Sequence, residues 1–143
     1  MSMTLLFRRL TTAALLLCLV VVVFGAYVRL SDAGLGCPDW PGCYGHLTVP
    51  TEAQHIEQAQ QNFPQRPVVH EKAWKEMTHR YLASTLGLLI LGLALLSFRA
   101  GHPRVLPRVL VLLVVFQGLL GMWTVTWLLK PLAVTAHLLG GLS

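Results

Sequence analysis

Nineteen consecutive residues near the start of the chain, LTTAALLLCLVVVVFGAYV (residues 10–28), carry no charge. Two further stretches share this property: residues 81–98, which number 18, and residues 109–129, which number 21 and include Gln117 as their one strongly polar side chain. As helices rising 1.5 Å per residue they would be roughly 27–31 Å long, about the thickness of the hydrocarbon core of a bilayer. The sequence therefore predicts three membrane-spanning helices.

The composition agrees with a membrane protein. Of the 143 residues, 55% are hydrophobic and 12% are charged, whereas soluble domains carry about 25% charged residues. This excludes a disordered chain and argues against a water-soluble globule. A fourth apolar stretch, residues 131–143, would be only about 20 Å long as a helix. We expect an all-α membrane protein, an up-down four-helix transmembrane bundle with a truncated fourth helix, that is either a fragment or one half of a larger molecule.

Positive charge gathers in two short segments. Arg8 and Arg9 precede the first stretch, and Arg99, Arg104 and Arg108 lie between the second and the third, with no acidic residue in either segment. Short loops rich in Lys and Arg face the cytoplasm, so we expect a cytoplasmic N-terminus and a periplasmic loop over residues 29–76. The first stretch exceeds the 7–15 apolar residues of a signal peptide, which favours a retained anchor in a bacterial membrane. Membrane insertion accounts for the net charge of +5 without a nucleic-acid partner.

The outer loop contains two cysteines in the segment GCPDWPGC (residues 36–43). Its prolines and glycines favour tight turns. Outside the cytoplasm a structural disulfide between Cys37 and Cys43 is the default interpretation. A labile redox pair is an alternative. A metal site with Asp39 and His46 is another, although zinc ligands are usually spaced more closely.

The remaining sequence of the loop at residues 29–76 predicts one short polar helix. Residues 51–54, TEAQ, resemble a capping box, which indicates a helix near residues 52–62. Pro67 suits the first turn of the next helix. That helix would begin at about Val68 and continue past Glu76 and His79 into the second span.

Two histidines, His79 and His137, fall where ionisable groups are costly. His79 lies at the outer mouth of the second span, and His137 lies six residues after Pro131, about 9 Å along a helix. Intramembrane ionisable residues indicate function, and two histidines from two helices could hold a haem iron axially. The alternative is helix packing with one hydrogen bond per histidine. Both interpretations use the small neighbours of these histidines, namely Ala83 and Gly87, and Ala133, Gly140 and Gly141.

Glu76 precedes His79 by three residues, so both side chains share one helical face. Its carboxylate could pair with Lys72 or Arg80 in solvent, orient the histidine, or move protons at a bound substrate. Arg80 could extend toward water or bind an anionic group such as a haem propionate. Arg29, at the outer end of the first span, is similarly placed.

Several of these segments together resemble the haem A synthase family. They are GAYVRLSDAGLGCPDWPGCYG (residues 25–45), EMTHR (residues 76–80), QGLLG (residues 117–121) and TAHL (residues 135–138). The first corresponds to the first-loop signature of the family, and the second to its Glu-x-x-His-Arg motif. The resemblance covers nearly the whole chain.

The resemblance implies an oxidoreductase that converts a methyl group of haem O into the formyl group of haem A for cytochrome oxidase assembly. Family members mostly have eight spans in two similar halves, and this chain matches the N-terminal half, the presumed substrate half. By that match His79 and His137 are axial haem ligands, Arg80 belongs to the haem-binding residues, Glu76 is the catalytic carboxylate, and Cys37 and Cys43 form a disulfide.

The resemblance also implies partners. Haem b would occupy the missing C-terminal half, which a second copy could replace, and haem O synthase could supply the substrate. The expected location is the bacterial inner membrane. Three other functions stay open: a haem-binding half without turnover, a bis-histidine electron-transfer cytochrome, and a membrane thiol oxidoreductase using Cys37 and Cys43.

Overall fold

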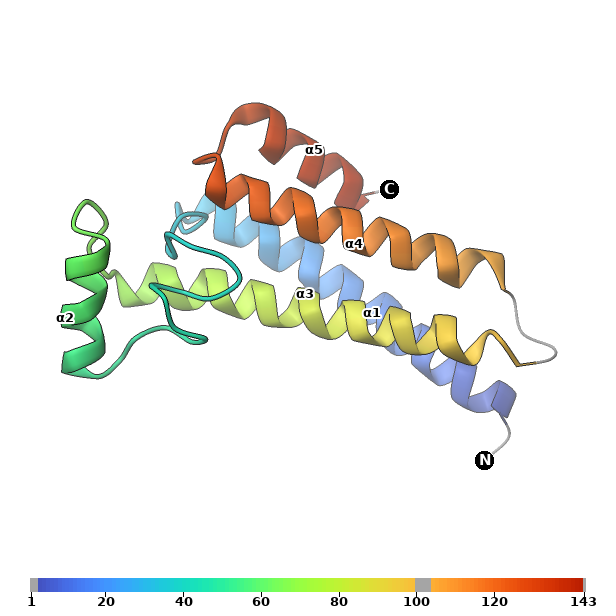
Figure 1. Ribbon diagram of the computed structural model, residues 1–143. Helices are drawn as coiled ribbons and strands as arrows, with labels where there is room; N and C mark the ends of the chain where they lie inside the picture. Colours follow the sequence, from blue (N-terminus) through green and yellow to red (C-terminus); the bar gives the residue numbers. More distant parts are fainter. Residues whose placement is uncertain (1–2, 100–103, 143) are drawn as a thin grey trace.

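The computed structural model describes residues 3–99 and 104–142 (Figure 1). This part of the chain is helical, with α1 (Met3–Leu30), α2 (Ala53–Asn62), α3 (His70–Leu96), α4 (Val105–Thr126) and α5 (Pro131–Leu142). An isolated β-bridge joins Cys43 to His46, and the described residues contain no strand. The all-α prediction is therefore confirmed.

Three helices are long and apolar enough to cross a membrane: Thr4–Leu30 within α1, and the whole of α3 and α4. Many of their large apolar side chains face outward. Leu15, Leu88 and Leu112 are each about 70% exposed. In water such exposure would be costly, but in a bilayer these side chains meet lipid. The chain is accordingly a membrane protein.

The long helices pack in the order in which they occur. α1 packs against α3, α3 against α4, and α4 against α5. Figure 1 shows α5 folded back along α4, and α2 set apart beside the N-terminal end of α3. Ala14 of α1 and Leu86, Ile90 and Leu93 of α3 form the centre of the apolar contact within the membrane part.

The predicted spans are found, with different boundaries. α1 continues through both flanking arginines at its start and through Arg29 at its end. α3 is one uninterrupted helix, as expected, but it begins at His70 and not near Val68. α5 contains 12 residues, short as predicted, and Ser143 lies outside the described residues.

The predicted capping box is wrong in detail, although the helix exists. α2 begins at Ala53, its N-cap residue is Glu52, and no side chain caps it. The helix is held by tertiary contact, since Ala59 lies fully buried against the disulfide loop.

Candidate functional site

The outer loop folds over the start of α3 around a disulfide. Cys37 and Cys43 are joined, with an S–S distance of 2.00 Å, and both are fully buried. They form a second apolar core with Ala73 and Met77 of α3 and with Tyr44. The Tyr44 hydroxyl donates to the carbonyl of Pro67 at 3.0 Å, and burial raises the pKa of this phenol.

Asp39 closes the turn of this loop. Its two carboxylate oxygens accept from the backbone N–H groups of Tyr44 (2.6 Å) and Gly45 (2.7 Å). The His46 ring contacts the His55 ring in a tilted arrangement, with ring centroids 4.5 Å apart. Within residues 3–99 and 104–142, no group of three or more His, Cys, Asp or Glu side chains is arranged to hold a bare metal ion. Asp39 therefore binds backbone N–H groups and His46 contacts His55, whereas the metal-site alternative would have both side chains bind one metal ion with the cysteines.

Glu76 lies beneath this loop and is only 5% exposed. One carboxylate oxygen, Oε2, accepts from the backbone N–H of Cys37 at 2.9 Å. The other, Oε1, accepts from Arg80 Nη2 one helical turn away. Lys72, the alternative partner, pairs instead with Asp32 at 2.6 Å. The lysine holds the pKa of Asp32 below its usual range, mainly through this hydrogen bond. Glu76 therefore pairs with Arg80 and not with Lys72. This ion pair is buried, whereas the pair considered from the sequence would lie in solvent.

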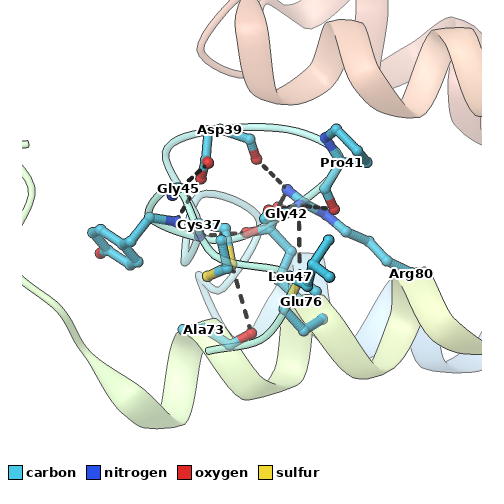
Figure 2. The surroundings of a disulfide bond; sticks show 12 residues. Cys37, Asp39, Pro41, Gly42, Gly45, Leu47, Ala73, Glu76 and Arg80 are labelled. Carbon is cyan, nitrogen blue, oxygen red and sulfur yellow. Dashed lines mark hydrogen bonds and ion pairs between the residues drawn. A yellow bond between two sulfur atoms is a disulfide. The ribbon is translucent and has the colours of Figure 1, made fainter. Parts of the chain in front are cut away.

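Arg80 connects α3 to the loop (Figure 2). Nη1 donates to the carbonyls of Pro41 (3.3 Å) and Gly42, and Nη2 donates to the carbonyl of Asp39 (3.0 Å) as well as to Glu76. Nη1 also donates to the Met77 sulfur at 3.7 Å. A guanidinium has two N–H groups on each terminal nitrogen, so the four oxygen acceptors and this sulfur leave neither terminal nitrogen free. A haem propionate would have to displace one of them or approach the remaining Nε.

The two candidate ligand histidines lie on α3 and α5. His79 follows Glu76 by three residues on α3, and His137 lies in the middle of α5. Their Nδ1 atoms are both buried and have no hydrogen-bond partner in the described part of the chain. A buried polar group without a partner is uncommon and calls for an explanation.

Each imidazole packs on a glycine of a neighbouring helix. A Cβ added to Gly25 of α1 would lie 2.7 Å from His79 Cε1, which is too close for any real contact. A Cβ added to Gly121 of α4 would lie 3.4 Å from His137 Cε1. Both glycines belong to the segments quoted above, but no pattern in those segments indicates that they contact histidines.

Two of the small residues that share a helix with the histidines lie against side chains of α4. Gly87 faces Val114, whose Cγ1 would lie 3.3 Å from an added Cβ. At Gly140 the added Cβ would lie 2.0 Å from Nε2 of Gln117. These two glycines therefore admit side chains of α4, as the packing alternative describes.

Comparison with known proteins assigns the family. Residues 8–143 match the model of the COX15-CtaA family, described as cytochrome oxidase assembly protein. The chain belongs to this family.

Curated relatives agree. The protein named Heme A synthase in Shewanella oneidensis is 56% identical over 126 residues, which are 87% of this chain and 38% of that protein. Proteins of the same name in Shouchella clausii and Bacillus licheniformis are 29% and 30% identical over 124 and 132 residues, or 83% and 89% of this chain. The match covers 36% and 37% of those two proteins. The chain thus spans little more than a third of the length of these relatives. No solved structure matches it.

The site therefore has two parts in this family member. The outer part joins Glu76 and Arg80 to the disulfide loop, and the inner part holds His79 and His137 against glycines. Since Glu76 and His79 share one face of α3, the two parts adjoin.

Proposed function

We propose that the chain is the substrate-binding N-terminal half of a haem A synthase. In this proposal His79 and His137 bind haem O through its iron, and a methyl group of the macrocycle is oxidised to a formyl group. The observation that carries the proposal is the pair of imidazoles on two helices whose Nδ1 atoms are buried and unpartnered. The family match and the relatives named Heme A synthase support it.

The residues fit a haem. Imidazole nitrogen is a common axial ligand of haem iron, and helical bundles build such sites from facing helices. Gly25 and Gly121 pack against the two imidazoles, and because they are glycines no side chain occupies the space of the rings. When bound, the haem supplies the methyl group to be oxidised and a redox-active iron.

The histidines position the substrate. Holding the macrocycle from two helices fixes which edge meets Glu76, and orientation of this kind lowers the barrier of a reaction. The apolar helices exclude water, which strengthens every charge interaction within the site.

Glu76 acts as a fixed carboxylate. Because Arg80 and the Cys37 N–H hold its two oxygens, we propose that it stabilises positive charge that develops at the substrate edge. Taking up a proton there would first require release from Arg80. Arg80 thereby contributes to the site by orienting Glu76 and the loop.

The proposed setting is the bacterial inner membrane. The N-terminus would lie in the cytoplasm, and the disulfide loop would lie in the oxidising periplasm. A C-terminal half carrying haem b, or a second copy of this chain, would complete the enzyme, and a haem O synthase would supply the substrate.

The test is to purify the chain from bacteria that make haem O and to identify the extracted haem by chromatography. We expect the wild-type chain to carry haem O or haem A, and His79→Ala and His137→Ala to carry neither. Glu76→Gln should retain haem O but yield no haem A. A folded wild-type chain free of haem would contradict the proposal.

A haem-binding half without turnover is the second candidate. The tight enclosure of Glu76 by Arg80 and the loop favours it, because a structural carboxylate needs no chemistry. In that case the wild-type chain would retain haem O and produce no haem A. An electron-transfer cytochrome would carry another haem, and Glu76→Gln would leave its electron transfer unchanged.

A further inference from the structure

Three buried side-chain atoms have no hydrogen-bond partner in the described part of the chain: Nδ1 of His79, Nδ1 of His137 and Nε2 of Gln117. The first two belong to the proposed haem ligands. The third belongs to Gln117, the one strongly polar side chain among residues 109–129. An amide buried without a partner in an apolar surrounding costs free energy, so the position of Gln117 requires a reason.

Gln117 lies in the contact between α4 and α5, one turn from the His137 ring. Its side-chain amide fills the space above Gly140, which follows His137 by three residues on α5. Gly121, one helical turn from Gln117 on the same face of α4, packs against the imidazole itself. The two unpartnered groups thus share one helix–helix contact.

A haem ligand needs a defined arrangement of its two ring nitrogens. If Nε2 binds iron, Nδ1 carries the proton and must find an acceptor. The Gln117 amide offers an oxygen acceptor as well as its N–H donors, and a half-turn about its last side-chain bond exchanges them. In the described structure the two groups are not hydrogen-bonded to each other, but a turn of the Gln117 side chain toward His137 would pair its oxygen with Nδ1–H.

We propose that Gln117 is a positioning residue for His137, whose Nδ1–H it accepts so that Nε2 stays free for iron. This inference rests on the proposed function, since it assigns a partner to one of the two proposed ligands. Gln117 touches neither substrate nor iron in this account. The other proposed ligand, His79, has an unpartnered Nδ1 as well, and the inference assigns no partner to it.

The first experiment needs no haem. The chain is labelled with ¹⁵N-histidine in detergent, and His137→Ala identifies the His137 signals. We expect the proton of His137 on Nδ1 in the wild-type chain, and a shift toward Nε2 in Gln117→Leu. Gly118→Ala is the matched control, because a Cβ added there meets no atom within 4 Å. It should leave the tautomer unchanged.

The second experiment loads the same proteins with haem and measures affinity and reduction potential. Loss of a hydrogen-bond partner of a metal-binding histidine typically weakens binding 10–100-fold, and we expect a loss of about that size in Gln117→Leu. Its potential should rise, because the imidazole donates less charge to iron. Gln117→Glu, a stronger acceptor of the same shape, should lower it. A mere packing role would not shift the two variants in opposite directions.

The outcomes separate the two proposals. An unchanged tautomer in Gln117→Leu, or a shift of both variants' potentials in one direction, would overturn the role of Gln117. A wild-type chain that binds no haem, while its His137 tautomer still responds to Gln117→Leu, would overturn the proposed function and leave the hydrogen bond standing.

Discussion

Removing the Arg80 guanidinium should destabilise the whole outer loop. In Arg80→Met the Glu76 carboxylate, 7% exposed, would stay buried without its cation. The carbonyls of Asp39, Pro41 and Gly42 would lose their donors at the same time. Breaking a buried ion pair by removing one partner costs about 3–5 kcal/mol. We expect the free energy of unfolding of Arg80→Met to fall by about that amount.

A second variant tests whether the unpaired carboxylate of Glu76 causes the loss of stability. Combining Arg80→Met with Glu76→Gln removes the charge, and the glutamine oxygen can still accept from the Cys37 N–H. The double variant should therefore be more stable than Arg80→Met alone. Lys72→Met is the matched control, because Lys72 of α3 pairs with Asp32 and their side chains are 39% and 83% exposed. Exposed pairs contribute little, so this variant should change stability far less.

The assay is reversible unfolding of the purified chain in mixed micelles, followed by tryptophan fluorescence, with hydrogen exchange at the Cys37 amide as a local readout. Arg80→Met should speed that exchange, and the double variant should slow it again. The reasoning is refuted if Arg80→Met unfolds like the wild-type chain, or if the double variant is less stable than the single one.

Three further predictions concern the loop and the histidines. Gly25→Ala should weaken haem binding on the order of tenfold, because the added Cβ must displace the His79 imidazole. A haem titration measures this loss. The control is Gly92→Ala, whose added Cβ meets no atom within 4 Å and which should bind haem as the wild type does. Replacing Cys37 and Cys43 by serine should lower the free energy of unfolding by about 2 kcal/mol, the loop-closure entropy of so short a loop, and equal stability under oxidising conditions would disprove this. Tyr44→Phe should cost about 1 kcal/mol at neutral pH through its lost hydrogen bond. Because the folded-state pKa of Tyr44 is raised, its contribution is present below pH 10 or so and is lost as the pH rises through that pKa, so stability measured against pH should fall less steeply above pH 10 in the variant.

The membrane helices could be predicted because length and absence of charge are local properties. The uncharged stretches at residues 10–28, 81–98 and 109–129 all lie mostly within long helices. Their ends were less predictable. Helix boundaries depend on tertiary contacts, as for α2, which starts at Ala53 without a side-chain cap.

The partner of Glu76 could not be chosen from the sequence. Lys72 and Arg80 are equally spaced from it, and the choice depends on how the loop folds over α3. Asp32 forms an ion pair with Lys72, and Arg80 donates hydrogen bonds to the loop carbonyls of residues 39, 41 and 42.

The local sequence pattern likewise could not predict which residues contact the two histidines. Helical spacing indicated Gly87 and Gly140 as neighbours of the proposed ligands on their own helices. The glycines that meet the rings, Gly25 and Gly121, come from other helices. Only the packing of α1 on α3 and of α4 on α5 brings them there.

The central proposal is that one haem binds between α3 and α5. The most direct measurement is a haem titration of the detergent-purified chain, followed by optical and electron paramagnetic resonance spectra. His79→Ala and His137→Ala serve as test variants, and His46→Ala, in the outer loop, serves as control. The proposal predicts one low-spin, bis-imidazole haem per chain in the wild type and in His46→Ala, and its loss in both test variants. A low-spin spectrum that persists in both His79→Ala and His137→Ala would contradict it.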